Sequence, residues 1–517
     1  MRLTRIHLAE SPDRAPGAGI GSVDLDSETL RAEAPNAPAP GTSTLPLNGP
    51  EATDGNGSTQ WASVLRGVLI DRLQVAPEVE GSQQAAALPD EFVDRFLSPA
   101  AASASQVHAM ISDWVGRIDV LVSAQLNEIL HAAPFLELEA SWRGIHYLVQ
   151  SCEPAPLLQI RVLNCTKAEL VKDFEKSPYY DQSLLFRKVY EDEFATLGGS
   201  PFGLLVGDYE FTRQPQDIDL LTEISKIAAV AHAPFISAAS PKLLGLDAFS
   251  ELSSVRNLGR IFEAVEFVSW RTFCSLETSR YVGLCLPRVL LRPPHSHIAA
   301  DGFTFQEDTQ GNKPEKYLWG NPAYAFATLV VDAFTRYHWC AAIRGILTGG
   351  LVSGLSAHSY ATPEDELARN EVARIGPTDA TISEELESSL AAAGFIPLIS
   401  CRNTDYAVVF STPSCHSPPR GSDPQAHLIA QLPYVFAGAR IAQYIDVMIR
   451  DKFGSILNRT DCEAYLNSWM SRYVTPDESA SDDVKVQLPL RHAEVRVFDV
   501  PGRPGHYTAV LYIIPHF

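Results

Sequence analysis

The chain of 517 residues carries 41 Lys and Arg against 62 Asp and Glu, a formal net charge of −21 at pH 7. Such a negative charge argues against nucleic-acid binding, because a protein that binds the phosphate backbone needs a basic surface. Hydrophobic residues make up 45% and charged residues 20%, which is ordinary for a globular protein of about three domains. No apolar run is long enough to span a bilayer, and MRLTRIHLAESPDR lacks the apolar core of a secretory signal, so a cytoplasmic location is expected.

The eight cysteines form no C-x-x-C pair and are spread through apolar segments. This distribution is typical of reduced, mostly buried thiols in a cytosolic protein.

Residues 1–60 are rich in Pro, Gly, Ala, Ser and Thr and hold few large apolar residues, which predicts a disordered tail. Residues 61–100 are expected to form a short helix, at WASVLRGVLIDRL, and a linker.

A layered α/β core is predicted for residues 101–474. Its first element is a long N-terminal amphipathic helix of about eight turns at 103–131, where apolar residues recur every three or four positions. The apolar residues of this helix are Val107, Ile111, Trp114, Ile118, Leu121, Leu126 and Ile129.

Residues 182–211 organise this core. They read as an amphipathic helix that stops at Gly198 and Gly199, followed by a short buried strand at 202–206 that ends at a Gly-Asp pair. A second amphipathic helix begins at Asp217. Helix, buried strand and helix make one unit of a layered α/β domain.

The rest of the core shows the same helical and strand periodicities. Helices are predicted at 134–150, 167–174, 258–274, 321–343, 425–453 and 462–473. Strands are predicted at 157–163, 234–237, 281–291, 395–399 and 407–410, and an exposed acidic insertion at 354–380.

Residues 475–517 are predicted to form an acidic linker and a C-terminal β-hairpin. Apolar and polar residues alternate in 490–500 and in 506–514, and a PGRPG turn lies between these two runs. Two strands alone are only marginally stable, and an exposed strand edge pairs readily with another chain. We therefore expect this hairpin to be an arm that pairs with a strand of another subunit, with Val495 and Val497 among its contacts.

Few residues suggest chemistry. No phosphate-binding loop, H-E-x-x-H or G-x-S-x-G motif occurs. Four carboxylates follow the central strand, where an α/β enzyme places acid–base groups, but turns and a helix N-cap at Asp217 explain them better. These carboxylates are Asp208, Glu210, Asp217 and Asp219.

Two further pairs of residues are weaker candidates for a functional site. His295 and His297 stand in a Pro-rich loop without a nearby Cys or paired carboxylates, and Cys415-His416 are adjacent residues that rarely face each other. We expect no catalytic residue, metal site or cofactor, and this favours an assembly protein over an enzyme.

Several long motifs occur along the chain from about residue 118 to 517. They are IDVLVSAQLNEILHAAPFLELEASWRGIHYLV, DQSLLFRKVYEDEFATLGGSPFGLLVGDYEF, AAVAHAPFISAAS, SRYVGLCLPRVLLRPP, YLWGNPAYAFA, WCAAIRGILTGGLV, GFIPLIS, RDKFGS and FDVPGRPGHY. Together they resemble the large sheath subunit of the bacterial type VI secretion system, the TssC (VipB/ImpC) family.

The resemblance implies a fold like that of phage tail sheaths and no catalysis. It implies assembly with the small subunit TssB into heterodimers that stack around the Hcp tube on a baseplate. Contraction expels the tube, and the ATPase ClpV disassembles the contracted sheath.

The resemblance and the residues together suggest contact sites. The helix at 103–131 is expected to pack, through Ile111 and Ile118, against a helix of the small subunit. Weak ion pairs near RDKFGS are expected to meet the tube. The residues of this second site are Arg440, Arg450, Asp451 and Lys452.

The chain departs from the family pattern at CSLETSRYVGL, at AQYIDV and at its last residues IIPHF, where relatives continue with a further strand. This departure predicts weaker lacing between subunits. It also favours one alternative to a sheath subunit, a diverged paralogue that acts as a binding or capping module and does not polymerise. A second alternative is an α/β hydrolase-like enzyme that uses the carboxylates from Asp208 to Asp219.

Overall fold

The computed structural model describes residues 104–196, 199–255, 258–298, 303–309, 313–360, 373–401, 404–419, 424–451, 458–477, 479–499 and 507–516. They fall into two units. Ile129–Ser296 and Gln306–Phe517 belong to one, and α3 (Ala104–Leu130) up to Glu128 belongs with His297–Phe305 to the other. The predicted tail at 1–60 and the helix and linker at 61–100 lie outside the described residues.

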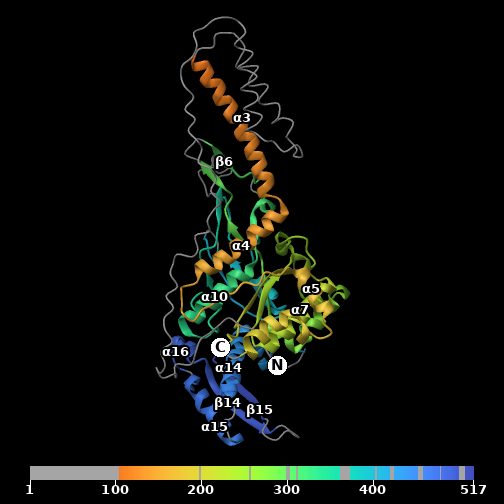
Figure 1. Cartoon of the computed structure of the whole chain (residues 1–517), viewed down its shortest axis with the longest axis vertical. Helices are drawn as coiled ribbons and strands as arrows, with labels where there is room; N and C mark the ends of the chain where they lie inside the picture. Colours follow the sequence, from red (N-terminus) through yellow and green to blue (C-terminus); the bar gives the residue numbers. More distant parts are fainter. Residues whose placement is uncertain are drawn as a thin grey trace. The chain divides into compact units, whose positions relative to one another are not determined.

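A four-stranded sheet forms the centre of the first unit (Figure 1). Its strands, in spatial order, are β1 (Leu205–Phe211), β2 (Phe235–Ala239), β3 (Val282–Leu286) and β11 (Phe395–Pro397). All three pairings are parallel, and β2, β3 and β11 are buried at every residue, which explains their continuous apolar sequences. Parallel strands between helices confirm the predicted α/β class.

Helices cover both faces of the sheet. On one face, α7 (Pro215–Ala231) packs in the same core as Phe235; on the other, α4 (Ala133–Ser151) and α10 (Pro322–Tyr337) share a core with Ile236. Neighbouring strand residues thus enter opposite cores, as the period of two along a strand requires.

The strand predicted at 202–206 is displaced along the chain. It is β1, at an edge of the sheet, which runs from Leu205 to Phe211 and contains Gly207. A Cβ on Gly207 would lie 2.4 Å from the ring of Phe235, so glycine here permits close packing of β1 on β2 rather than ending the strand.

The strand predicted at 157–163 is wrong, because these residues have no strand pairing. They connect α4, whose Leu148 lies in one core, to α5 (Lys167–Lys176), whose Leu170 lies in the other. In this connection the guanidinium of Arg161 lies 5.7 Å from the ring of Phe202, which precedes the edge strand β1.

Several predicted helices and strands are confirmed with small shifts of their ends, and others are each divided into two elements. The predicted strand at 281–291 bends at Pro287 into β3 and β4 (Val289–Arg292). The predicted helix at 425–453 is two helices, α13 (Pro424–Ile429) and α14 (Leu432–Asp451), because Pro433 has no N–H with which to continue α13 but suits a first turn.

The remaining helices are short. The α-helices are α6 (Leu184–Phe186), α8 (Leu258–Glu263), α9 (Val268–Ser275), α12 (Glu384–Ala392), α15 (Arg459–Met470) and α16 (Asp482–Gln487), and η2 (Arg187–Ala195) is a π-helix. The 3₁₀ helices are η1 (Tyr180–Gln182), η3 (Pro241–Leu244), η4 (Phe249–Ser254), η5 (Val265–Phe267), η6 (Glu277–Tyr281), η7 (Pro314–Lys316) and η8 (Ser471–Tyr473).

The remaining strands pair in small sheets. They are β5 (Ser296–Ile298) with β6 (Thr304–Gln306), β4 with β7 (Leu318–Gly320), β9 (His358–Tyr360) with β10 (Ala373–Ile375), and β12 (Ile399–Ser400) with β13 (Ala407–Val408) and β8 (Leu351–Val352). The predicted C-terminal hairpin is β14 (Leu490–Asp499) with β15 (Tyr507–Pro515), antiparallel.

We predict that Gly207→Ala destabilises the chain by about 1–3 kcal/mol, because the added methyl overpacks the β1–β2 contact. Urea unfolding measures this change. Gly376→Ala is the control, since the nearest atom to its new Cβ lies 3.9 Å away. Equal stability of the two variants would show that the sheet accommodates a side chain at position 207.

Candidate functional site

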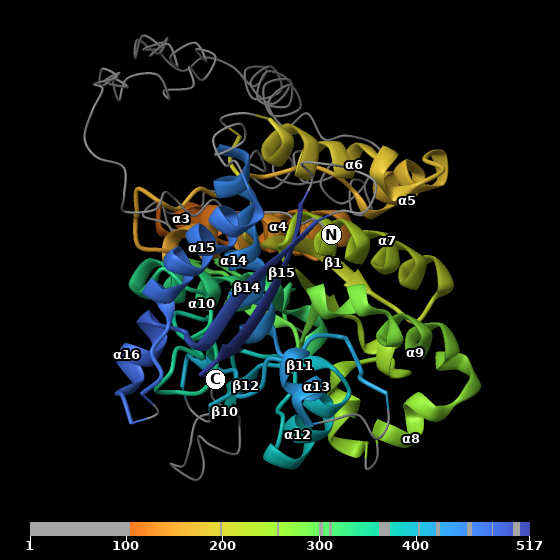
Figure 2. The same ribbon diagram turned by 90° about the horizontal axis from the view of Figure 1, so that it is seen from below.

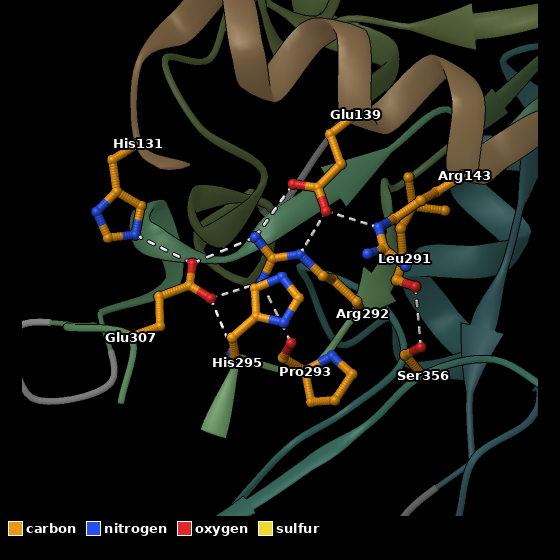
Figure 3. Close-up of polar contacts among 9 residues, drawn as sticks. All are labelled: His131, Glu139, Arg143, Leu291, Arg292, Pro293, His295, Glu307 and Ser356. Atoms are coloured by element: carbon orange, nitrogen blue, oxygen red, sulfur yellow. Dashed lines mark hydrogen bonds and ion pairs between the residues drawn. The ribbon is translucent and has the colours of Figure 1, made fainter. Parts of the chain in front are cut away.

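A buried ionic network surrounds Arg292, the last residue of β4 (Figure 3). Its guanidinium donates to both oxygens of Glu139 on α4, at 2.7 and 3.1 Å. It also donates to both oxygens of Glu307, at 2.6 and 3.3 Å. The side chains of Arg292 and Glu307 are only 5% and 2% exposed. One arginine thus joins helix α4, strand β4 and the segment that follows β6.

Further donors complete the network. Arg143, one turn along α4, donates to Glu139 at 2.7 Å, and the backbone N–H of His295 donates to Glu307 at 2.8 Å. Nε2 of His131, which precedes α4, lies 3.3 Å from an oxygen of Glu307 (Figure 3). Two arginines and two glutamates balance in charge, which is what a buried cluster requires.

The electrostatics hold both carboxylates ionised. Burial opposes the charge of Glu139, but hydrogen bonds from Arg292 and Arg143 outweigh it, so the pKa of Glu139 lies below its usual value. The pKa of Glu307 is lowered in the same way, by Arg292 and the His295 N–H against burial. A carboxylate whose pKa is lowered is a poor proton donor, and its hydrogen bonds here join several elements, which supports a structural role for the network.

The sequence did not reveal this network. Glu139 and Glu307 are 153 and 15 positions from Arg292 in the sequence, and no local motif links the three residues. A second buried acid was also missed: burial raises the pKa of Asp379 to about 7, although Arg288 opposes this shift. One oxygen of Asp379 accepts the N–H of Arg288, which assigns it a structural role in the turn between β3 and β4.

Two of the four predicted carboxylates, Glu210 and Asp217, are engaged in contacts within the fold. Both oxygens of Glu210 accept from the guanidinium of Arg288, at 2.5 and 2.8 Å. Asp217 is not the N-cap of α7, which begins at Pro215; its carboxylate instead accepts from the N–H and hydroxyl of Thr212, at 2.7 and 2.8 Å.

The described histidine and cysteine candidates have shifted pKa values. Burial, together with the charge of Arg292, lowers the pKa of His295, and the side chain of His297 lies outside the described residues. Burial raises the pKa of Cys415, which disfavours the thiolate that a nucleophile needs. Among the described residues, no three His, Cys, Asp or Glu side chains come together as metal ligands.

The C-terminal hairpin presents a second feature. Its inner face packs on α14 and α15, and α15 lies along β14 (Figure 2). The Asn467 side chain bonds both the N–H and the C=O of Val495, at 2.9 and 2.7 Å, and Glu463 accepts the N–H of Val497 at 2.9 Å. The outer edge of β14 is therefore covered by its own chain.

The edge of β15 remains available. Since the backbones of Val495 and Val497 face away from β15, their partners Leu511 and Ala509 must face outward too. A groove of about 560 Å³ lies beside this edge. It is lined by residues of η6, α13, α14 and both hairpin strands, among them Tyr281, Ile429, Tyr434, Val435, Leu511 and Ile513.

These contacts correct the predicted partner residues of the hairpin. The side chains of Val495 and Val497 are buried in the core with Ile441, Leu466 and Trp469, so they cannot contact another chain. The alternation in the sequence identified an apolar face correctly, but that face is covered from within.

The predicted tube contact is also corrected at Arg440. This arginine is 9% exposed and donates to the hydroxyl of Tyr444 at 2.5 Å, and burial lowers its pKa. It belongs to the core of α14 and is not an exposed ion-pairing group. The side chains of Arg450 and Asp451 and the whole of Lys452 lie outside the described residues, as does the side chain of Ile111.

Two residues of the predicted stripe on α3, Ile118 and Ile129, are exposed, whereas Trp114 is buried. Val115 and Val122, which were not predicted, are exposed on the same side of the helix as Ile118 and Ile129. In the described part of the chain, no helix is long and apolar enough to cross a membrane.

Comparison with known proteins gives consistent results. Residues 112–416 match the family model VipB, described as EvpB/VC_A0108, tail sheath N-terminal domain, and residues 422–517 match VipB_2, the tail sheath gpW/gp25-like domain. The chain is 41% identical over 416 residues to the type VI secretion system sheath protein TssC1 of Pseudomonas aeruginosa, covering 79% of this chain and 82% of that protein.

We predict that Arg292→Met destabilises the fold by roughly 3–5 kcal/mol at pH 7, because two carboxylates stay buried without their main partner. Urea unfolding measures the loss. Arg336→Met, which removes a largely exposed pair with Asp332, should cost at most about 1 kcal/mol.

We also predict how the stability difference between the wild type and Arg292→Met changes with pH. In the wild type the pKa values of Glu139 and Glu307 are lowered, so their contribution to stability is complete above the ordinary pKa of a glutamate and is lost as the pH falls through their folded pKa values. Without Arg292, burial should raise these pKa values, so the deficit of the variant should shrink on acidification from pH 7 toward 5. A deficit that is constant with pH would contradict this electrostatic account.

Proposed function

The chain belongs to the VipB/EvpB tail sheath family, and we propose on that premise that it polymerises with the small sheath subunit around the Hcp tube in the bacterial cytoplasm. As the large subunit of a type VI secretion contractile sheath, it acts through contacts between subunits rather than through catalysis. Contraction then propels the tube, and the proposal includes attachment to a baseplate and later disassembly by ClpV.

One observation carries the proposal: the hairpin has one covered edge and one available edge. Asn467 and Glu463 engage β14, whereas β15 borders a groove. An extended segment of another subunit can add to β15 by main-chain hydrogen bonds, with its side chains in the groove. Such strand addition links subunits strongly without a preformed apolar interface.

The contact would be heterologous, because the incoming segment differs from the edge that receives it. Contacts of this kind do not close on themselves, and they generate helical filaments when the rotation does not close a ring. Two packings of the same subunits that differ by a modest free energy then suffice for contraction.

We predict that Ala509→Pro prevents long sheaths. The N–H of Ala509 faces away from β14, so proline removes a donor for an incoming strand but none of the hairpin's own hydrogen bonds. Ala509→Thr keeps the N–H and is the matched control. Electron microscopy of the chain co-expressed with the small subunit should show tubules for the wild type and the control, and short complexes for Ala509→Pro.

Two outcomes would contradict the proposal. Long tubules formed by Ala509→Pro would show that β15 does not receive a strand. Discrete small complexes from the wild type would show a binding or capping protein that does not polymerise.

We also predict that Ile118→Asp reduces co-purification of the small subunit at least about tenfold, because a charge in the apolar stripe of α3 opposes helix packing. Val120→Asp is the control: Val120 is exposed on the opposite side of the same helix. Equal losses from both variants would indicate damage to the helix itself, and no loss from either would exclude the stripe as a contact.

A further inference from the structure

A short backbone ladder joins the start of β4 to the segment between β10 and α12. The N–H of Leu290 donates to the carbonyl of Pro377 at 2.8 Å. The N–H of Asp379 donates to the carbonyl of Arg288 at 3.1 Å, and the residues between these two pairs form an antiparallel bridge. This ladder is the main-chain connection between β4 and the residues that lead into α12.

A side chain replaces one backbone group in the ladder. The N–H of Arg288 donates to Oδ1 of Asp379 at 3.1 Å, whereas in a regular antiparallel pair it would donate to the backbone carbonyl of the facing residue. The half-buried Asp379 thus accepts through its carboxyl and donates through its N–H. One end of the ladder therefore depends on the state of this carboxyl group.

Arg288 lies next to two acids but bonds only one of them through its guanidinium. Its Nε and Nη2 donate to the two oxygens of Glu210 on β1, at 2.5 and 2.8 Å. Asp379 receives the backbone N–H of Arg288 instead. When all three groups are ionised, the cluster carries one negative charge in excess. Burial makes such an excess unfavourable, and uptake of a proton by Asp379 removes it.

The neighbouring charges do not supply a further cation. The ammonium of Lys167, which donates to the Glu210 carbonyl, pairs with Asp217 at 2.7 Å. Burial raises the pKa of Asp379 to about 7, the charge of Arg288 opposes this shift, and the charge of Glu210 adds to it. The Asp379 carboxyl therefore changes its charge near neutral pH.

The helix that follows adds charges of the same sign as Glu210. The first turn of α12 carries Glu384, Glu385 and Glu387. Because these are like charges, any effect that they have on Asp379 favours its protonated form as well.

We propose that the cluster of Asp379, Arg288 and Glu210 is a proton-sensitive switch that holds β4 to the segment before α12 when Asp379 is protonated and loosens this connection when Asp379 is ionised. The strand β4 ends at Arg292, so the switch acts on the strand that carries the buried ionic network. The inference lies within one subunit and does not rest on the proposed function.

The direction of the pH effect follows from the two states of the ladder. Opening exposes Asp379 to water, where the pKa of an aspartate is about 3.9. Because the folded pKa of about 7 is higher, the ladder is most stable at low pH and loses stability as the pH rises through 7. Between pH 6 and pH 8 the equilibrium constant for opening should increase about tenfold.

Hydrogen exchange at the Leu290 amide measures this opening in the full-length chain. The wild type is compared with Asp379→Asn at each pH, which cancels the pH dependence of the chemical exchange step. Asparagine keeps an acceptor for the Arg288 N–H but cannot ionise. The ratio of the wild-type rate to the variant rate should rise about tenfold from pH 6 to pH 8, and a ratio that stays constant would overturn the proposal.

A second variant tests the role of the cluster. Glu210→Gln removes the like charge and weakens the competing hold on Arg288, so the pH at which the Leu290 rate changes should fall by about one unit or more. Asp332→Asn is the control, because Asp332 is 39% exposed and pairs with Arg336 on α10, and it should leave this pH unchanged. An equal response of both variants would show that Glu210 does not set the switch.

The wild type alone provides a measurement that does not depend on how the variants fold. The carboxyl-carbon NMR resonance of Asp379 should titrate with a midpoint near pH 7. A midpoint below pH 5 would mean that the buried carboxyl is ionised throughout the neutral range, and the proposal would then be wrong.

Discussion

The buried charge of Arg292 is the constraint on which the positions of its neighbours depend. An arginine that is 5% exposed needs carboxylates nearby, and here they come from α4 and from the segment after β6. Removing either partner leaves an uncompensated charge, so the elements stay in one arrangement. Because α4 is held on one side by these bonds and by α10, its opposite side becomes a surface. A structural ionic network in this way determines which apolar residues another chain can reach.

Strand edges are treated differently in different parts of the fold. At the edge strand β1, Lys167 of α5 donates to the Glu210 carbonyl at 2.8 Å. Helix α15 covers the edge of β14 with two polar side chains. The edge of β15 borders a groove instead. A monomeric protein normally protects its exposed edges, so an edge with a groove beside it is a feature expected of a subunit that assembles.

Several side chains that might perform chemistry are engaged in contacts within the fold. Glu210 is bonded to Arg288, Glu307 to Arg292 and Asp217 to Thr212, and the thiol of Cys415 is buried. The surface of the fold includes the edge of β15 and exposed apolar residues on α3 and α4. Interfaces of these kinds can exist in two packings of similar free energy, and a change between them moves subunits without breaking covalent bonds.

The sequence by itself determined the family, the α/β class, the long helix α3 and the C-terminal hairpin, because these follow from local periodicity and long motifs. It also placed an apolar row on α3. It could not show which apolar faces are covered by other parts of the same chain. Val495 and Val497 are buried and Trp142 is exposed, although all three lie in regular apolar patterns of a strand or a helix. Nor could it pair Arg292 with Glu139, 153 residues away, or show that 157–163 form no strand. Tertiary structure decided these points, because burial and charge pairing depend on distances through space, whereas periodicity reports only neighbours along the chain.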